Sequence, residues 1–443
     1  MIHIFQAPCG SGKSEIIRRL ADKHSDKSFL VLFKNHDNEE SWNLGQSYPQ
    51  TRDLFIYSDI EEMYKLGLNP GQMVYLFINN NLSNDPSVQA YMQKKQSFNN
   101  ARVKKGCIER FFISDDFSEI DTDIVVFDES VIEHAVKIGN ITVKDLKTIR
   151  DSKLISFNNF SLLMDKLKHS KRFTKSLIKD IQGDIKKDFT TALSISESIK
   201  SLNELLNSDY YEWNFDSNKN PRIIYMQNRL NRLDAIANNP KKKVFIFSAT
   251  PEMTLYNSRF ETRLHQLPEA DMKSEITFYL PSTKTAQTSL LSMSDKEIIK
   301  MLKAAKVGHV KNLMSFKKFI PPPGYNLVNW WGCECGTNDF IGQDLTVIGT
   351  FRYPEYVIKF LAKAAGLTFD ESKAQWENQT VTVEGYNITG RFMKDDTLRK
   401  LEIEMCQNKI IQMMHRGRPI TEDVTCTVIS DIPLPRIPLQ HLL

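Results

Sequence analysis

The feature that most constrains this chain is a glycine-rich turn between an apolar strand and a helix, near the amino-terminal end. The apolar segment 2–5 is followed by the turn APCGSGKS at residues 7–14, and helical periodicity begins at residue 15. Two glycines in such a turn let backbone N–H groups approach phosphate oxygens, and the start of the helix favours an anion. The segment therefore predicts a phosphate-binding loop at the carboxyl end of a first strand.

The residue types inside this turn each have a chemical reason. We expect Lys13 to reach the β and γ phosphates of ATP and the Ser14 hydroxyl to ligate Mg²⁺. The residues expected to surround the phosphates are Pro8, Gly10, Ser11, Gly12, Lys13 and Ser14. The usual first glycine of the pattern is replaced by Ala7, so the turn departs from the strict form by one methyl group.

The overall composition is that of an ordinary globular protein. With 443 residues, 41% hydrophobic and 25% charged, the chain is long enough for two or three domains. A net charge of +4 permits nucleic-acid binding without requiring it. Six cysteines are too few for a disulfide framework in a chain of this length, and no apolar run approaches membrane-spanning length. We therefore expect a cytoplasmic protein with no membrane partner.

Apolar runs that alternate with helical patterns predict an α/β fold with parallel sheets. In the first part of the chain these runs lie at 29–33, 53–57, 110–113, 123–127 and 242–247. After residue 266 further runs lie at 326–328, 345–348 and 426–429, with helical patterns at 295–306, 354–366 and 396–415. The pattern predicts two such units in sequence.

A long, mostly helical segment at 132–240 separates two of the predicted strands, and it is too long for a simple crossover. Apolar residues at helical spacing in it are Leu163, Leu167, Leu177, Ile181 and Ile185. Residues 141–200 carry 13 Lys and Arg against 7 Asp and Glu. Two interpretations stay open, a solvated helical face or a surface that contacts the nucleic-acid backbone.

Polar residues follow two of the predicted strands directly. Asp128 and Glu129 come after the run 123–127, and Ser248-Ala249-Thr250 follows the run 242–247. Parallel sheets bind their ligands at the carboxyl ends of strands. We expect Asp128 to hold Mg²⁺ and Glu129 to orient and deprotonate an attacking water.

Taken together, these segments resemble the motifs of a superfamily 2 helicase of the DEAD/DEAH type. Residues 7–14 resemble motif I, 128–131 motif II and 248–250 motif III, while 336–339 and 412–419 resemble motifs V and VI. The resemblance implies two RecA-like parallel-sheet domains with ATP in the cleft between them. The expected domain 1 comprises 1–131 and 241–265, the helical basic insertion 132–240, and domain 2 residues 266–443.

The resemblance also assigns roles to residues outside the phosphate-binding loop. Ser248 and Thr250 are expected to couple the nucleotide site to domain movement, and Gln412 to contact water or ribose. Arg416 and Arg418 are both expected near the phosphates, and which of them reaches the γ-phosphate stays open. Nucleic-acid contacts are expected from Lys34, Asn35, Lys317, Thr337 and Asn338.

The resemblance implies an ATP-dependent helicase or translocase that acts on nucleic acid, DNA in preference to RNA. The divergent motifs of this chain are similar to those of helicase-like proteins of phages and mobile elements. The expected location is therefore the host cytoplasm, and replication or recombination proteins are expected as further partners. Two alternatives stay open: a double-stranded DNA translocase or origin-binding remodeller without strand separation, and a P-loop kinase of small molecules. Cys333 and Cys335 do not predict zinc, since no second pair of ligands lies nearby.

Overall fold

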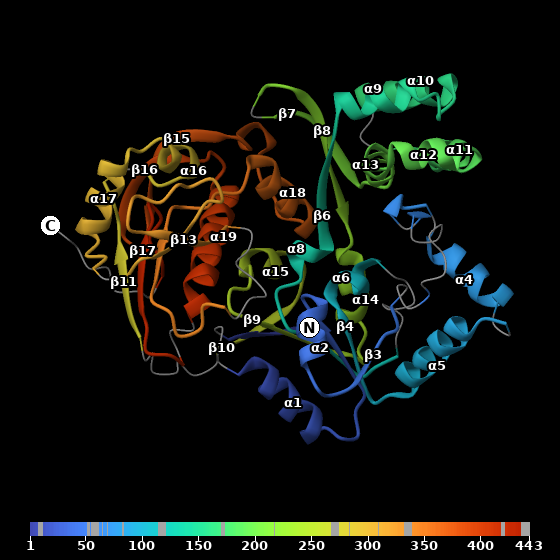
Figure 1. The fold of residues 1–443 in the computed structure, drawn as a ribbon, viewed down its shortest axis with the longest axis horizontal. Helices are drawn as coiled ribbons and strands as arrows, with labels where there is room; N and C mark the ends of the chain where they lie inside the picture. Colours follow the sequence, from blue (N-terminus) through green and yellow to red (C-terminus); the bar gives the residue numbers. More distant parts are fainter. Residues whose placement is uncertain are drawn as a thin grey trace.

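A computed structural model gives the arrangement of the chain (Figure 1). It describes all residues except 8–11, 51–53, 55–61, 64, 69, 82–83, 114–120, 170–172, 217, 267–273, 283, 309, 332–338, 418–420 and 436–443. Within the described part, no helix combines the length and apolar character that crossing a bilayer demands.

The first sheet, sheet A, has seven parallel strands in the order β10-β1-β9-β5-β2-β4-β3. The strands are β1 (Ile2–Gln6), β2 (Phe29–Phe33), β3 (Gln46–Ser47), β4 (Val103–Cys107), β5 (Ile124–Phe127), β9 (Lys243–Ser248) and β10 (Thr262–Gln266). All residues of β2 and β5 are buried, as expected for central strands covered on both faces.

Helices cover both faces of sheet A (Figure 1). One face packs against α1 (Lys13–Lys23), which buries Ile17 and Ala21. The other face packs against α6 (Ile108–Ile113), α8 (Ile132–Ala135), α14 (Leu230–Ala237) and α15 (Met253–Arg259). Along the sequence, three further helices separate β2 from β4, namely α2 (His36–Ser41), α4 (Pro70–Asn81) and α5 (Pro86–Asn100).

The prediction of a strand at 110–113 is wrong. These residues belong to α6, in which the buried Ile108, Phe111 and Phe112 follow helical spacing. The strand is β4, just before them, and its sequence VKKGC hides its nature because two lysines interrupt the apolar pattern. Both lysines are buried along their stems, and their ammonium groups donate to backbone carbonyls. The strand expected at 53–57 lies outside the described residues, except for Leu54.

The second sheet, sheet C, has five parallel strands in the order β11-β17-β14-β12-β13. They are β11 (Glu275–Tyr279), β12 (Asn312–Ser315), β13 (Asn326–Trp330), β14 (Leu345–Ile348) and β17 (Thr425–Ile429). Its helices are α16 (Gln287–Leu291), α17 (Asp295–Ala304), α18 (Glu355–Ala365) and α19 (Asp396–Met414), with 3₁₀ turns η2 (Glu371–Lys373) and η3 (His415–Gly417). The α/β class and the three longer helices predicted here are confirmed.

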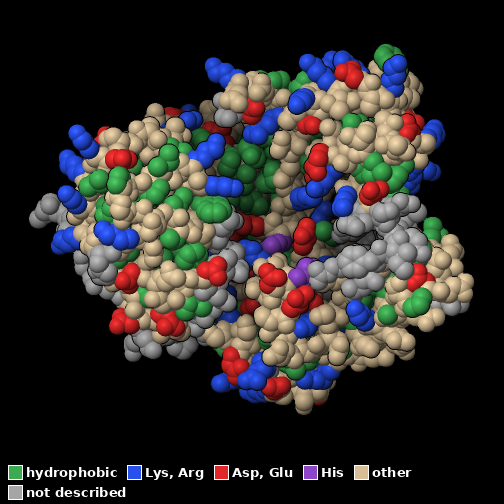
Figure 2. Space-filling view, viewed as in Figure 1, with side chains coloured by type: hydrophobic (Ala, Val, Ile, Leu, Met, Phe, Trp, Pro, Cys, Tyr) green, Lys and Arg blue, Asp and Glu red, His purple; other side chains and the backbone are tan. Residues whose placement is uncertain are grey.

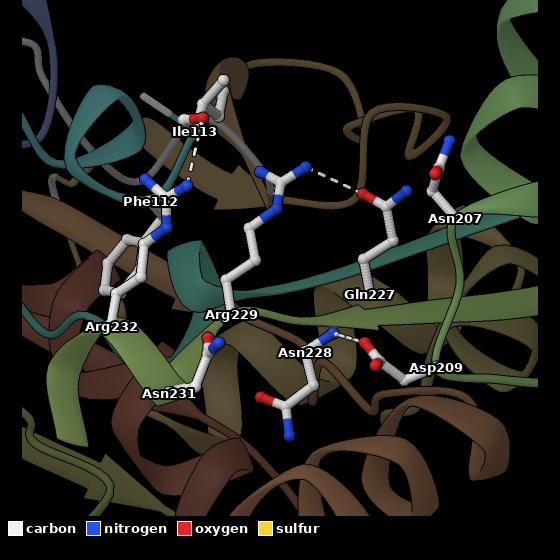
Figure 3. Close-up of a pocket in the computed structure, with 9 residues that line it drawn as sticks. All are labelled: Phe112, Ile113, Asn207, Asp209, Gln227, Asn228, Arg229, Asn231 and Arg232. Carbon is white, nitrogen blue, oxygen red and sulfur yellow. Dashed lines mark hydrogen bonds between the residues drawn. The ribbon is translucent and has the colours of Figure 1, made fainter. Parts of the chain in front are cut away.

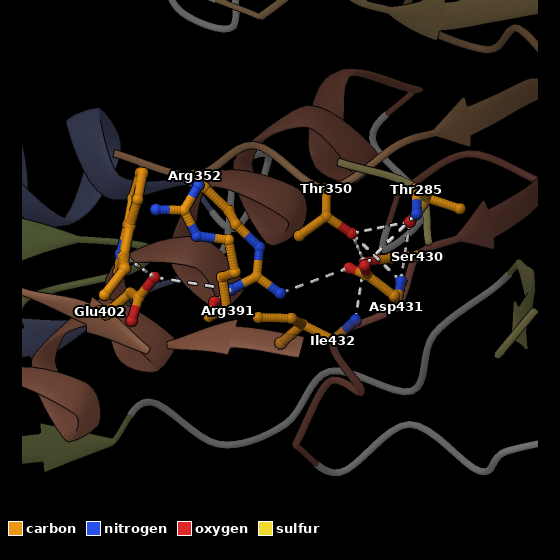
Figure 4. A network of polar contacts seen from close by, with 9 residues as sticks. Thr285, Thr350, Arg352, Arg391, Glu402, Ser430, Asp431 and Ile432 are labelled. Atoms are coloured by element: carbon orange, nitrogen blue, oxygen red, sulfur yellow. Dashed lines mark hydrogen bonds and ion pairs between the residues drawn. The ribbon is translucent and has the colours of Figure 1, made fainter. Parts of the chain in front are cut away.

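A hairpin that the sequence analysis did not predict lies between α18 and α19. It consists of β15 (Trp376–Val383) and β16 (Tyr386–Met393), paired antiparallel. A polar network fixes it beside the carboxyl ends of the sheet C strands (Figure 4). Arg352 lies 3.5 Å from a carboxylate oxygen of the fully buried Glu402, which also accepts a hydrogen bond from the backbone of Met393. The other arm of Arg352 lies 3.8 Å from Asp431, just beyond β17.

Between α8 and α14, the chain forms a body of helices and a small sheet. Following α8 it contains α9 (Val143–Asp151), α10 (Phe157–His169), α11 (Lys175–Lys187), α12 (Phe189–Ser194) and α13 (Ser196–Leu206). The leucines and isoleucines noted at helical spacing lie in α10 and α11 and are buried. The prediction of a mostly helical segment missed the antiparallel sheet β6-β8-β7, made of β6 (Val136–Thr142), β7 (Tyr210–Phe215) and β8 (Pro221–Asn228).

Helix α18 joins sheet C to the rest of the molecule. It packs against α15 of the first sheet and β6 of the small sheet, and its apolar residues belong to the same core as sheet A (Figure 1). The fully buried Phe360 ring lies 5.4 Å from Tyr210 of β7, centroid to centroid. Beside it, Lys359 Nζ lies 2.6 Å from the Glu212 carboxylate. These contacts fix the relative position of the two sheets.

We expect Phe360→Ala to lower the free energy of unfolding by about 3–5 kcal/mol, since it leaves a cavity where three parts of the chain meet. Urea denaturation followed by tryptophan fluorescence measures this change. Phe157→Ala is the matched control, because that ring is 89% exposed on α10. Equal stability of both variants would mean that α18 does not hold the two sheets together.

Candidate functional site

The phosphate-binding loop predicted from the sequence begins at the carboxyl edge of sheet A. The amide of Ala7, just after β1, donates to the Ser248 carbonyl at the end of β9 (2.9 Å). At the other end of the loop, Gly12 has a left-handed backbone with φ of 79° and precedes α1 directly. A side chain would strain this conformation. Lys13 and Ser14 open the helix, whereas Pro8, Gly10 and Ser11 lie outside the described residues.

Two carboxylates follow β5 at the same edge, and their environments differ. Burial raises the pKa of Asp128 to about 7, although the charge of Lys13 opposes the shift. Burial also opposes ionisation of Glu129, but Lys13, Lys34 and a hydrogen bond from Ser248 outweigh it and lower its pKa. Lys13 thus acts on both carboxylates, which means that the structure brings the loop and the acidic pair together.

The residues around Asp128 fit a divalent cation. Its Oδ1 atom is buried and has no hydrogen-bond partner in the described part of the chain. A buried carboxylate oxygen of this kind is a hard ligand that needs a positive charge. The other Mg²⁺ ligand expected from the sequence is the hydroxyl of Ser14, an exposed residue in the first turn of α1.

A series of hydrogen bonds leads from Glu129 to helix α19. Ser248 Oγ donates to Glu129 Oε1 (2.9 Å), and the Thr250 amide donates to Ser248 Oγ (3.3 Å). Gln412 Nε2 then donates to Thr250 Oγ1 (2.7 Å), and Asn408 Nδ2 donates to the Thr250 carbonyl (3.3 Å). Gln412, expected to contact water or ribose, therefore uses its amide nitrogen on Thr250. Its Oε1 atom is buried without a hydrogen-bond partner among the described residues.

The turn η3 after α19 contains His415 and Arg416, and its imidazole lies within electrostatic range of Lys13. His415 is only 8% exposed, and burial lowers its pKa to about 4, helped by the charges of Lys13 and Arg416. Lys13 belongs to α1 and Arg416 to η3, so residues from the two ends of the sequence act on one imidazole. Arg418, the other candidate arginine, lies outside the described residues.

A cluster around two acidic residues, the buried Glu252 and the exposed Glu133, was not predicted. Glu252 accepts a hydrogen bond from Ser130 Oγ, and burial raises its pKa to about 8 with help from the nearby Glu133. Glu133 in turn accepts from the Tyr353 hydroxyl and lies 3.4 Å from Lys409 Nζ. No sequence signal reveals this cluster, since its members come from α8, the loop before α15, and the second sheet's helices and loops.

The expected nucleic-acid contacts are spread over both sheets. Asn35 accepts from the Asn38 amide (2.9 Å) and so caps α2, while Lys34 lies within electrostatic range of Glu129. Lys317 Nζ lies 5.5 Å from the centroid of the Trp330 ring on sheet C. Thr337 and Asn338 lie outside the described residues.

A polar pocket of about 280 Å³ lies where α6 meets β8 and α14 (Figure 3). Its lining residues are Phe112, Ile113, Asn207, Asp209, Gln227, Asn228, Arg229, Asn231 and Arg232. Arg229 donates to Gln227 Oε1 (2.8 Å) across it, and the Asn228 amide donates to Asp209 (2.6 Å). Its walls come from segments about a hundred residues apart, so the sequence pattern gave no sign of it.

Comparison with known proteins shows the fold. No family model and no curated protein matches the chain. A solved structure titled "XPD_Helicase" is 15% identical, with a TM-score of 0.56 over 97% of this chain and 92% of that one. A second, "Structure of S. tokodaii Xpd4", is 13% identical with a TM-score of 0.52 and the same coverage. The chain therefore shares the overall α/β fold of these two structures, and its two parallel sheets are consistent with two RecA-like domains.

The raised pKa of Glu252 predicts how the stability of the folded chain depends on pH. Its pKa of about 8 in the folded chain lies above the ordinary 4.5, so the folded state keeps a proton that the unfolded state releases. Stability should therefore fall as pH rises from about 4.5 to about 8. We expect Glu252→Gln to flatten this fall in melting temperature, measured across the same range.

The matched control is Glu261→Gln, because Glu261 is exposed and its neutralisation should leave the pH dependence unchanged. A Glu252→Gln variant whose melting temperature follows pH as the parent does would contradict the assignment of a protonated, buried carboxyl.

Proposed function

We propose that this protein is a nucleic-acid-stimulated ATPase that couples Mg-ATP hydrolysis to movement along DNA or to separation of its strands. The observation that carries the proposal is that Gln412 of α19 donates to Thr250, which continues through Ser248 to Glu129, with Lys13 and Arg416 both in electrostatic range of His415. Groups from the two RecA-like domains thus meet at one place, beside the paired carboxylates. A cation on each side suits a triphosphate held between them.

The phosphates would be held by the loop and by the start of α1, with Gly12 giving the turn and Lys13 a charge. Ser14 and Asp128 would hold Mg²⁺, which neutralises phosphate charge when bound. The raised pKa of Asp128 supports this role, because a carboxylate there is poorly stabilised by the protein alone.

Glu129 is the group suited to accept a proton from the attacking water. Lys13, Lys34 and the Ser248 hydroxyl keep it ionised despite its burial. Arg416 would stabilise charge that develops on the phosphate in the transition state, as a cation supplied from the second domain. The neutral His415 next to it adds no charge of its own at pH 7.

The hydrogen bonds from Glu129 through Ser248 and Thr250 to Gln412 support coupling between hydrolysis and domain movement. A change in the hydrogen bonding of Glu129 on phosphate release alters the partner of Ser248, and Thr250 lies two residues further on. Since Thr250 contacts α19 directly, the change reaches the second domain. Closure and reopening of such domains are the usual source of stepping.

Surface charge supports a nucleic-acid partner. Figure 2 shows a hollow between the second domain and the inserted body, with Lys and Arg side chains on both rims. Away from the hollow, on the outer side of the inserted body, α11 exposes Lys175, Lys179, Lys186 and Lys187. Such a surface binds phosphates in a salt-dependent way. We propose that the substrate is DNA and that the protein acts in the cytoplasm. We also propose that it is a DEAD/DEAH-type protein of a phage or mobile element and that its partners are replication or recombination proteins.

The ATPase rate, measured with single-stranded DNA, duplex DNA and RNA in turn, tests this function. We expect nucleic acid to stimulate the rate, and Lys13→Ala to abolish it under all conditions. Glu129→Gln should keep nucleotide binding while turnover falls at least about 100-fold, since the general base is lost. An ATPase rate that does not change when nucleic acid is added, or that persists in Lys13→Ala, would contradict the proposal. Strand-displacement and triplex-displacement assays, run in parallel, distinguish unwinding of a duplex from translocation along it.

Charge reversal on α11 tests the proposed contact of the inserted body with nucleic acid. In Lys175→Glu/Lys179→Glu we expect weaker binding to DNA at low salt and a slope of log K against log salt that is smaller by about 1 to 2. The matched control is Lys296→Glu/Lys300→Glu, two exposed lysines at the same spacing on α17, at the opposite side of the molecule from α11. Equal losses in both variants would show a general charge effect and refute a specific surface.

A further inference from the structure

Three potential metal ligands converge at the carboxyl edge of sheet A, on the segments that follow β2 and end β4. His36 Nδ1 lies 3.0 Å from Glu39 Oε2 and 3.1 Å from Cys107 Sγ. Cys107 Sγ lies 3.4 Å from the same oxygen of Glu39. A nitrogen, an oxygen and a sulfur atom thus form a compact triangle.

Hydrogen bonding alone does not account for this arrangement. The Nδ1 atom of His36 faces Glu39, Cys107 and, at 3.1 Å, the amide nitrogen of Gln50. An imidazole nitrogen has either one proton or one lone pair, so it satisfies only one of these three neighbours. Several donors directed at a common point are instead the arrangement expected around a cation.

The backbone fixes these donors before any ligand binds. Cys107 is the last residue of β4 and pairs in register with Phe33, three residues before His36. At the start of α2 the Asn35 side chain caps the helix. At its end the buried Lys105 ammonium donates to the carbonyls of Glu39 and Trp42, at 2.9 and 2.6 Å. The ligands are therefore held on rigid elements, as a selective site requires.

Burial leaves the cluster open on one side only. Glu39 is 2% exposed and Cys107 6% exposed, while the His36 side chain is 46% exposed. Among the described residues, the buried Glu39 carboxylate forms one ion pair, with His36. A water molecule can complete a fourth position from the open side, and so can the amide oxygen of Gln50 after a half-turn of its amide.

We propose that His36, Glu39 and Cys107 bind a zinc-class divalent cation. The thiolate selects against Mg²⁺ and Ca²⁺, which prefer oxygen, and the mixed sulfur, nitrogen and oxygen set suits Zn²⁺. Donors around four-coordinate zinc lie about 3.4–3.6 Å apart, so the triangle opens by only a few tenths of an ångström to accept the ion. The cation would tie the segment after β2 to the end of β4. This inference does not depend on the proposed ATPase activity.

Co²⁺ and Zn²⁺ binding to the metal-free full chain tests the site. Co²⁺ bound to a thiolate gives a near-ultraviolet charge-transfer band, which oxygen-bound Co²⁺ at the nucleotide site lacks. We expect one equivalent of band-forming Co²⁺ per chain, displaced by Zn²⁺. Both Cys107→Ser and His36→Ala should abolish the band and weaken Zn²⁺ at least about tenfold in competition with a chelator.

Two controls make the result specific. Cys406→Ser removes another buried cysteine that is not part of the cluster, and Cys333→Ser/Cys335→Ser removes the pair outside the described residues; both should keep the band. His36 is half-exposed, so His36→Ala is expected to fold, which its circular dichroism checks. The proposal is overturned by a band that survives in Cys107→Ser or folded His36→Ala, by its loss in a control, or by no band in the parent.

Discussion

The hydrogen bond between Gln412 and Thr250 is the contact on which the candidate site depends. It joins α19 of the second domain to the loop after β9 of the first, and Thr250 continues through Ser248 to Glu129. The bond lies in a buried region, so losing one partner would leave a polar group unsatisfied. Because α18 already fixes the two sheets against each other, this bond forms between prearranged groups.

The paired carboxylates show how neighbours in sequence acquire different chemistry. Both lie close to Lys13, yet the pKa of Asp128 is raised and that of Glu129 is lowered. The difference arises because Ser248 and Lys34 stabilise the charge on Glu129, whereas one oxygen of Asp128 lacks a hydrogen-bond partner in the described chain. Divergent shifts of this kind separate the roles of two acidic groups, here the base and the metal ligand that we propose.

Local patterns in the sequence were sufficient to predict much of the fold. The strand, glycine turn and helix at 2–23 are contiguous, and the fully buried β2 and β5 read as apolar runs. By contrast, β4 contains two lysines whose burial is possible only because carbonyls of other segments receive them. Its identity as a strand depends on tertiary contacts, so the apolar run after it was mistaken for the strand.

Contacts between distant segments were beyond reach for the same reason. The expectation that Lys13 and the arginines near the carboxy-terminal end share one nucleotide came from resemblance to a family, and Lys13 and Arg416 both act electrostatically on His415. The cluster of Glu133, Tyr353 and Lys409 had no comparable guide. Nor did the triangle of His36, Glu39 and Cys107, since His36 and Cys107 are 71 positions apart and adjacent only because β2 and β4 pair.

If the two domains share one nucleotide, ATP hydrolysis depends on the arginines that follow α19 in the second domain. We would measure nucleic-acid-stimulated ATP turnover in Arg416→Ala/Arg418→Ala, with ATP affinity determined in parallel. We expect turnover to fall at least about 10³-fold while ATP still binds. Turnover at the parent rate in this double variant would contradict it.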